Sequence, residues 1–153
     1  MAIFLVQHGK SLSKDVDPDQ GLSEQGILDT KRMAKVAKGY GIPVSGISHS
    51  GKTRARMTAE IFELALKPKN GILQVDEMAP LDDVATFAKT INPNKNRMFV
   101  GHLPFMEKLT SFLIAGSVTK PVFKFQNGGI LCLDLYPETK SWAIKWSLMP
   151  KID

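Results

Sequence analysis

Three histidines give the first chemical signal in this sequence, because each lies at or just beyond the end of a stretch that predicts a β-strand. They are His8, after residues 2–6, His49, after residues 44–48, and His102, after residues 97–100. In open α/β sheets, ligands bind at the carboxyl ends of the strands. A single histidine is more often a surface or core residue, but three at one edge of a predicted sheet indicate a shared site.

A basic side chain accompanies the histidines. Arg54 lies in the first turns of a predicted helix that begins at Gly51 or Thr53, directly after the second predicted strand. The free N–H groups and the dipole of a helix start attract anions, and a guanidinium binds phosphate oxygens in a bidentate manner. Arg56 points about 200° around the same helix, so we expect it to form an outward salt bridge. Histidine and arginine together favour phosphate as the ligand.

Zinc is the rival ligand, since three histidines can hold it. These histidines lack any short ligand spacing, however, and no carboxylate adjoins them in the sequence. A cluster of histidine and arginine is also electropositive before any metal arrives, which repels a cation. We therefore predict no metal at this site.

The turn after the first strand has residues that suit an anion. Gly9 allows the backbone to turn sharply and to approach a ligand closely. Lys10 adds a positive charge and Ser11 adds a hydroxyl group.

Strands and helices alternate along most of the chain. The predicted strands cover residues 2–6, 44–48, 72–75, 97–100, 122–125, 129–135 and 142–148, and the predicted helices begin at Ser23, at Gly51 or Thr53, at Asp82 or Asp83, and at Pro104. This alternation predicts an α/β fold, a three-layer α/β/α sandwich with a mostly parallel sheet and antiparallel C-terminal strands. Residues 1–153 are expected to form a single domain.

One face of the first predicted helix is apolar at helical spacing. Its residues are Ile27, Met33, Ala34, Ala37 and Tyr40. We expect this face to pack inward.

The composition excludes several functional classes. Among 153 residues there is one cysteine, Cys132, so an internal disulfide is impossible, and we expect it to be a small buried hydrophobe. No apolar stretch is long enough to span a membrane, and the N-terminal apolar run ends in His8 as a strand would, so we expect a cytoplasmic protein without a membrane partner. The net charge of +5 favours anionic ligands, but the basic residues are dispersed, which argues against nucleic acid.

Four segments, in order, resemble the motifs of the histidine phosphatase superfamily, the phosphoglycerate mutase-like group. They are Gln7-His8-Gly9, Leu22-Ser23 with Gly26, Ser50 with Arg54-Ala55 and Thr58, and Val100-Gly101-His102 with Pro104. The short chain, the His-Leu-Pro form at 102–104 and the segment from Glu77 through Pro80 to Asp83-Val84 most resemble SixA-type phosphohistidine phosphatases. The resemblance covers residues 2 to about 110, and the C-terminal strands are compatible with it.

The resemblance implies roles for individual residues and no cofactor. His8 would be the nucleophile, and Arg54 and His102 would hold the phosphoryl oxygens. The ring nitrogen of His8 that does not attack should be fixed by a hydrogen bond to a backbone carbonyl near Gly9. Gln7 stands where the family signature has arginine, so one charged phosphate contact is replaced by an amide.

We expect further phosphate contacts from Gln7 and from the turn that follows it, which contains Gly9, Lys10 and Ser11. Lys10 or His49 could replace the missing charge. The sequence does not decide whether His49 lines the site.

The leaving group decides the substrate class. Superfamily members that cleave phosphomonoesters use a carboxylic acid near the loop after the third strand, and SixA-type enzymes lack the usual acid because imidazole leaves more easily. Asp82 and Glu77 are the candidate acids here, and Asp83 is expected to cap a helix. The resemblance therefore implies phosphatase action on a phosphohistidine-bearing protein of a signal-transducing phosphorelay, with inorganic phosphate as product. A small phosphomonoesterase, and a weakly catalytic phosphate- or phosphoprotein-binding module, remain as alternatives.

Overall fold

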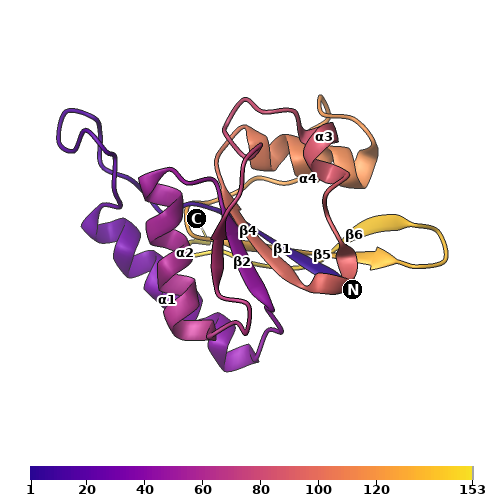
Figure 1. Ribbon diagram of the computed structural model, residues 1–153, viewed down its shortest axis with the longest axis horizontal. Helices are drawn as coiled ribbons and strands as arrows, with labels where there is room; N and C mark the ends of the chain where they lie inside the picture. The colour runs from indigo at the N-terminus through magenta and orange to yellow at the C-terminus, as the bar shows by residue number, and fades with distance from the viewer. Residues whose placement is uncertain (153) are drawn as a thin grey trace.

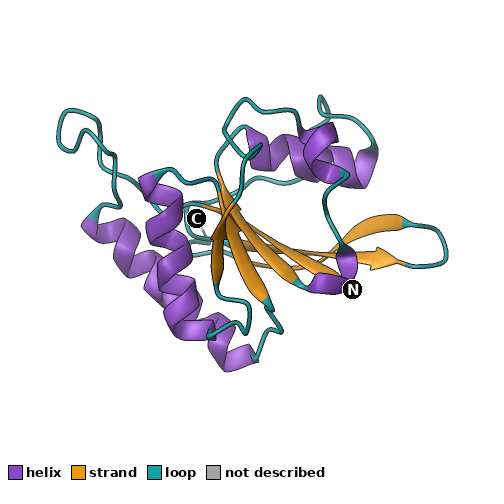
Figure 2. Ribbon diagram, in the orientation of Figure 1, coloured by secondary structure: helices purple, strands orange, loops and turns teal. Residues whose placement is uncertain are grey.

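The computed structural model describes residues 1–152, which form a six-stranded sheet with helices on both faces (Figure 1, Figure 2). The strands are β1 (Ala2–Gln7), β2 (Gly46–His49), β3 (Ile72–Gln74), β4 (Arg97–Gly101), β5 (Ile130–Tyr136) and β6 (Ser141–Leu148). They lie in the order β3-β2-β4-β1-β5-β6; β1 to β4 are parallel, and β5 is antiparallel to both of its neighbours. The predicted α/β sandwich with a mostly parallel sheet is confirmed.

The helices form two layers. The first layer contains α1 (Glu24–Tyr40) and α2 (Thr53–Leu66), which pack against each other, and the second contains α3 (Val84–Ala88) and α4 (Phe105–Ala115) (Figure 1). A short 3-10 turn, η1 (Pro93–Lys95), precedes β4. Among the described residues, none of these helices has the length and apolarity needed to cross a bilayer.

Strand β1 is buried on both faces, as its unbroken apolar sequence predicts. Phe4 and Val6 join the hydrophobic cluster under α1 and α2, while Ile3 and Leu5 join the cluster under α3 and α4. The strand therefore belongs to both halves of the core, and the residues that follow it are held at the centre of the sheet edge.

Local signals explain where the helices begin and end. The Ser23 side chain accepts a hydrogen bond from the Gly26 N–H and caps α1, while Gly41 ends that helix with a φ of 65°. The Asp83 carboxylate caps α3 by accepting from Ala85 and Thr86 N–H, as expected from the sequence. Cys132 is buried, which was also predicted.

The prediction of a strand at residues 122–125 is wrong. Both sides of β1 are already paired, with β4 and β5, and this segment follows Pro121 as irregular chain. Its apolar side chains serve packing instead: Phe123 and Phe125 form an edge-to-face pair with ring centroids 5.0 Å apart and contact the core on the α4 side.

Tyr40 was expected to face inward, and this is also wrong. The Tyr40 residue is 79% exposed, whereas Met33, Ala34 and Ala37 of the same face are buried. Tyr40 is the last residue of α1, where the helix leaves the core, and its ring lies at a surface cavity.

Several boundaries also differ from the predictions by one or two residues. Strand β2 begins at Gly46 and includes His49, because the chain at Val44 is not yet paired. Pro104 lies at the N-cap of α4, one position before the first helical residue Phe105.

Candidate functional site

His8 follows the carboxyl end of β1, and hydrogen bonds fix both its backbone and its ring. Its N–H donates to Gly101 O at 2.9 Å, and its carbonyl accepts from Asn127 Nδ2 at 2.9 Å. The ring Nδ1 lies 2.6 Å from Gly9 O, so Nδ1 carries the proton and donates. The expected hydrogen bond near Gly9 is therefore present, and it leaves the Nε2 lone pair of His8 free.

His102 lies beside His8 because β1 and β4 are adjacent parallel strands. Gln7 is in register with Gly101, and the two imidazole centroids are 5.0 Å apart. His102 is 1% exposed, and its Nε2 lies 2.5 Å from Ser50 Oγ. Its Nδ1 is buried without a hydrogen-bond partner among the described residues.

Arg54 is the second residue of α2, and its positive charge acts on both rings. It lowers the pKa of His8 and of His102, and burial lowers the pKa of Arg54 itself. No ion pair of Arg54 occurs among residues 1–152. This guanidinium is therefore available to an anion that enters between the histidines.

The start of α2 is tied to the turn after β1 through Thr58. Its Oγ1 accepts from the Gly9 N–H at 2.9 Å and donates to Arg54 O at 2.8 Å. Gly9 itself must be small, because a Cβ there would lie 2.6 Å from Thr30 Oγ1. These contacts fix His8 relative to Arg54.

Burial keeps the two central histidines neutral. Desolvation lowers the pKa of His8 to about 4, against a smaller upward effect of its hydrogen bond to Gly9, and Arg54 lowers it further. Desolvation also lowers the pKa of His102 to about 3, with added repulsion from His8, Arg54 and Lys52. Both rings are thus uncharged at neutral pH.

Gln7 and the residues of the first turn adjoin His8 along the chain. The Gln7 backbone carbonyl accepts from the Gly128 N–H at 2.9 Å, while its side-chain Oε1 is buried without a partner among the described residues. Lys10 is exposed, and Ser11 forms an isolated bridge with Leu22. Phosphate contacts from Gln7, Gly9, Lys10 and Ser11 stay predictions.

His49 lies at the same sheet edge but has a different environment. It is 4% exposed, and its Nδ1 accepts from the Gly51 N–H at 3.0 Å. Desolvation lowers its pKa, and the charges that act on it are those of Arg56 and Glu60. Arg56 and Glu60 form the outward salt bridge expected for Arg56, at 2.7 Å. The structure therefore gives His49 a role in holding the loop.

The candidate acids either accept hydrogen bonds from backbone N–H groups or are exposed to solvent. Asp82 Oδ2 accepts from the Ala79 N–H at 2.8 Å, and Asp83 caps α3. Glu77 is exposed and has a left-handed φ of 67°. The charged groups that shift the pKa values of His8 and His102 are all basic. Within residues 1–152, no group of three potential metal-ligating side chains occurs.

Two side chains at the site were not singled out from the sequence. Ser50, which contacts His102, is part of a motif but has no ionisable group to attract notice. Asn127 contacts the His8 carbonyl from 119 residues away, and only the turn signal of Asn127-Gly128-Gly129 precedes β5. A contact at such separation has no local sequence signal.

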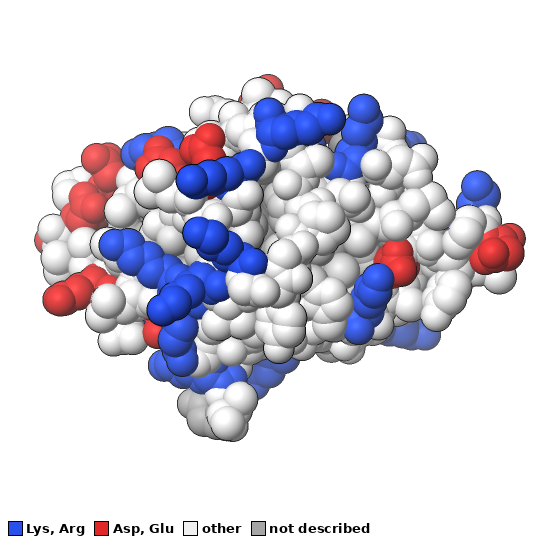
Figure 3. Space-filling view, turned by 90° about the horizontal axis from the view of Figure 1, so that it is seen from below, with Lys and Arg blue, Asp and Glu red and all other residues white. Residues whose placement is uncertain are grey.

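On the face seen in Figure 3, charged side chains do not form one continuous basic stripe. Many Lys and Arg side chains lie on the left part and are mixed with acidic side chains at its edge, and others are scattered over the right part. The groove between α1 and α2 contains Lys31, Lys35 and Lys38. This distribution agrees with the dispersed basic residues of the sequence.

The fold and the site together define an α/β protein with a cluster of two histidines and an arginine at the carboxyl edge of its sheet. No protein-family model and no curated protein matches the sequence. Solved structures do match. The chain has a TM-score of 0.83 and 22% identity to a structure of the protein histidine phosphatase SixA complexed with tungstate, covering 98% of this chain and 97% of that one.

Two further structures share the fold. The alpha-ribazole phosphatase from Shigella flexneri has a TM-score of 0.76 at 13% identity, covering 100% of this chain and 98% of that one. A mycobacterial glucosyl-3-phosphoglycerate phosphatase that complexes with VO3 has a TM-score of 0.73 at 14% identity, covering 97% and 99%. The chain therefore has the same fold as these three phosphatase structures, which agrees with the fold that the sequence resemblance implied.

Proposed function

We propose that this protein is a phosphatase that removes the phosphoryl group from phosphohistidine on a partner protein, with His8 as nucleophile. The observation that carries the proposal is the His8 ring, held by Gly9 O through Nδ1, beside His102 and Arg54. The fold is shared with a SixA structure complexed with tungstate and with a phosphatase that complexes with VO3. Both anions resemble phosphate.

The first step is attack on phosphorus by the Nε2 lone pair of His8. Because the pKa of His8 is lowered to about 4, the ring is neutral at pH 7 and needs no general base. A bond forms between His8 Nε2 and phosphorus while the bond from phosphorus to the substrate nitrogen breaks. The substrate ring carries a proton on its other nitrogen and leaves as neutral imidazole, and His8 keeps its Nδ1 proton. Water then attacks the phosphorylated His8 and releases inorganic phosphate, which regenerates the free ring.

Charge stabilisation comes from the groups around His8. Arg54 supplies a full positive charge that no carboxylate of the described residues neutralises. His102 supplies a neutral N–H, and its ring gains affinity for a proton when an anion binds next to it. Preorganised donors of this kind often give the largest contribution to catalysis.

The choice of phosphohistidine rests on the leaving group. An alkoxide needs a proton as it departs, whereas imidazole is a better leaving group. Asp82 and Asp83 both accept backbone hydrogen bonds, and Glu77 points into solvent. A substrate that requires no dedicated acid fits this arrangement.

The test is hydrolysis of a phosphohistidine-bearing phosphotransfer protein and of p-nitrophenyl phosphate by wild type and the His8→Ala variant. We expect phosphate release from phosphohistidine, with loss of at least about a thousandfold in the variant because the nucleophile is gone. His49→Asn is the matched control, since an asparagine oxygen can accept from the Gly51 N–H as the ring does. It should retain most of the activity.

Asp82→Asn separates the alternatives. It should leave phosphohistidine hydrolysis largely intact, whereas it should cripple a phosphomonoesterase that uses Asp82 as its acid. A severe loss on the phosphohistidine substrate would count against the proposal. If wild type binds vanadate but forms no labelled phosphoenzyme with either substrate, the protein is a phosphate-binding module and the proposal fails.

A further inference from the structure

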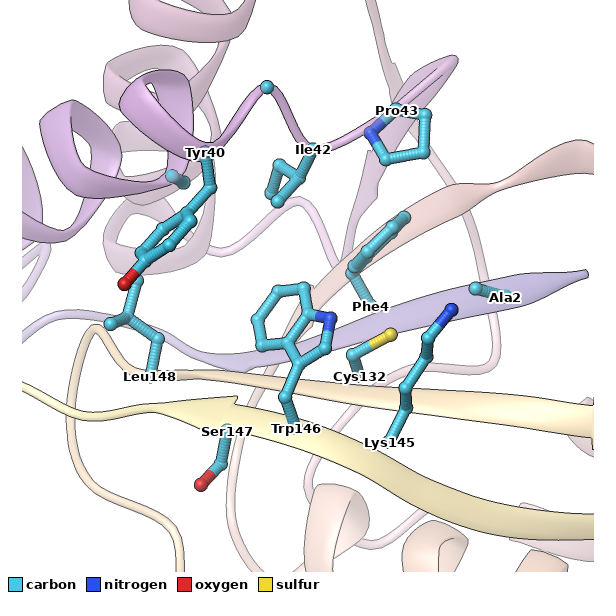
Figure 4. A pocket seen from close by; sticks show the side chains of 12 residues that line it. Ala2, Phe4, Tyr40, Ile42, Pro43, Cys132, Lys145, Trp146, Ser147 and Leu148 are labelled. Carbon is cyan, nitrogen blue, oxygen red and sulfur yellow. The ribbon is translucent and has the colours of Figure 1, made fainter.

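A second cavity lies on the α1 face of the sheet, away from the histidines. It has a volume of about 520 Å³ and opens between the end of α1, the amino-terminal half of β1 and strands β5 and β6 (Figure 4). Phe4 in its wall is four residues before His8, or about 13 Å along the strand. The cavity is therefore separate from the proposed phosphatase site.

The walls of this cavity are mostly apolar and aromatic. Phe4 and Trp146 form a tilted ring pair with centroids 6.0 Å apart, and Ile42, Cys132 and Leu148 add to the apolar surface. Cavities of about 300–1,000 Å³ with such walls are typical of small-molecule sites. The thiol of Cys132 is uncharged at neutral pH, because burial raises its pKa to about 11.

A β-bulge brings a charged side chain into this apolar cavity. In the β5–β6 ladder, Cys132 pairs with Trp146 and Leu133 pairs with Ile144, so Lys145 is the extra residue. In a regular strand, Lys145 and Trp146 would point to opposite faces. The bulge allows both to line the cavity, and bulges commonly redirect a side chain in this way.

Each polar side chain of the cavity can donate a hydrogen bond. Figure 4 shows the Trp146 indole nitrogen and the Lys145 ammonium on the side of Cys132, with Tyr40 and Leu148 at the other end. None of the described residues that line the cavity is acidic. Lys145 Nζ lies 3.8 Å from Asp134 Oδ2, but these side chains are 59% and 38% exposed, so this pair is weak.

We propose that this cavity binds a small amphipathic carboxylate, with its apolar body against Phe4, Ile42 and Trp146 and its anionic group at Lys145. The apolar walls exclude a strongly polar ligand such as a sugar phosphate, and the ammonium favours an anion over a neutral or cationic head group. This site is independent of the phosphatase activity proposed above.

The test uses decanoate, decanol and decylammonium as probes, each below its micellar concentration. Binding is followed through the indole N–H signals of the two tryptophans in nitrogen–proton correlation spectra of the full chain. Trp146 lines the cavity, whereas Trp142 packs on the opposite face of the sheet and serves as an internal reference. Decanoate should shift the Trp146 signal and leave Trp142 unchanged, with an affinity about two- to fivefold above that of decanol.

The variant Lys145→Met keeps the apolar stem and removes the charge. It should abolish the preference for decanoate over decanol, whereas Lys140→Met, in the same hairpin, should retain it. Equal affinity for all three probes, equal shifts of both tryptophans, or no shift of Trp146 would overturn the proposal. Self-association that protects the Trp146 signal without any probe would overturn it as well, since a second copy would then occupy the cavity.

Discussion

Single residues at the candidate site retain hydrogen-bonding capacity that the protein does not use. Gln7 Oε1 and His102 Nδ1 are both buried, and neither has a partner within residues 1–152. A buried polar atom without a partner costs about 1–3 kcal/mol of stability. Such atoms are expected where a ligand supplies the missing contacts or where stability has been exchanged for function.

Gln7 is the residue where the sequence departs from the family signature, and its replacement by arginine is our first prediction. Gln7→Arg should raise kcat/KM for phosphohistidine by about tenfold or more, because a guanidinium adds charge to a position that now offers an amide. The measurement is initial-rate phosphate release with wild type and the variant side by side.

Gln7→Met is the control for this prediction. Methionine has a similar size but no donor, so its kcat/KM should fall below that of wild type. A methionine variant with full activity would show that the Gln7 amide does not contact the transferring group.

The central residues of the candidate site were expected from the sequence, whereas the residues that hold them in place through hydrogen bonds were not. His8, Arg54 and His102 follow from residue type and from their positions after strands. The role of His49 in its loop depends on the direction of its ring, and the spacing of residues along the sequence does not give that direction. The contact of Asn127 with the His8 carbonyl forms only when the chain is folded, so no local sequence pattern predicts it.

At the scale of elements, the site depends on how α1 and α2 meet the turn after β1. Thr58 in α2 binds the Gly9 N–H, and Ser23 at the start of α1 binds Lys10 O through both its N–H and its hydroxyl. The first turn of α1 also lies directly against the Lys10 backbone at Gly26. Displacement of either helix start therefore moves the segment that carries His8.

Two glycines of α1 provide the second prediction. A Cβ at Gly26 would overlap the backbone of Lys10, whereas Gly39 has no atom within 4 Å of such a Cβ. Gly26→Ala should destabilise the protein by about 1–3 kcal/mol or more, because backbone cannot yield as a flexible side chain does. Gly39→Ala should stabilise it by about 0.5–1 kcal/mol through helix propensity.

Urea unfolding of both variants measures these changes, and phosphatase assays show whether Gly26→Ala also lowers kcat. Similar unfolding free energies for the two variants would mean that α1 does not hold the Lys10 backbone closely.

Most helices and strands were predictable because their apolar residues recur at a regular spacing and because capping residues mark their ends. The irregular chain at residues 122–125 was not predictable in this way. Its apolar residues Phe123 and Phe125 pack against each other and the core, and the segment has no strand partner. Tyr40 likewise fits the apolar period of α1, but the period does not say where the core ends. Sheet order and core extent are properties of the assembled layers.

At the scale of the whole molecule, the buried histidines couple stability to pH. In the unfolded chain a histidine has a pKa near 6.5, whereas the pKa falls to about 4 for His8 and about 3 for His102 in the folded protein. Between these values the unfolded chain binds more protons, so stability rises with pH across this window. The pKa of His49 is lowered as well, which adds to the same slope.

The third prediction is a loss of stability as pH falls below about 6.5, amounting to several kcal/mol by pH 4 at roughly 1.4 kcal/mol per unit of pKa shift. Urea unfolding at a series of pH values between 7 and 4 measures it. The lowered pKa of Asp83 acts in a separate window, because an acid with a depressed pKa loses its contribution only as pH falls below about 3.8.

The double variant His8→Gln/His102→Gln identifies the groups responsible. It removes both titrating rings, so the slope between pH 6.5 and 4 should shrink to the part that His49 supplies. Phosphate should stabilise the wild type more than the double variant at every pH, since a ligand that binds only the native state raises stability by RT ln(1 + L/Kd), with L the free ligand concentration. A stability curve that stays flat down to pH 4 would mean that the two rings are not desolvated in the folded protein. His8 would then titrate as an ordinary histidine near pH 6.5, and its neutral fraction at pH 7 would no longer depend on burial.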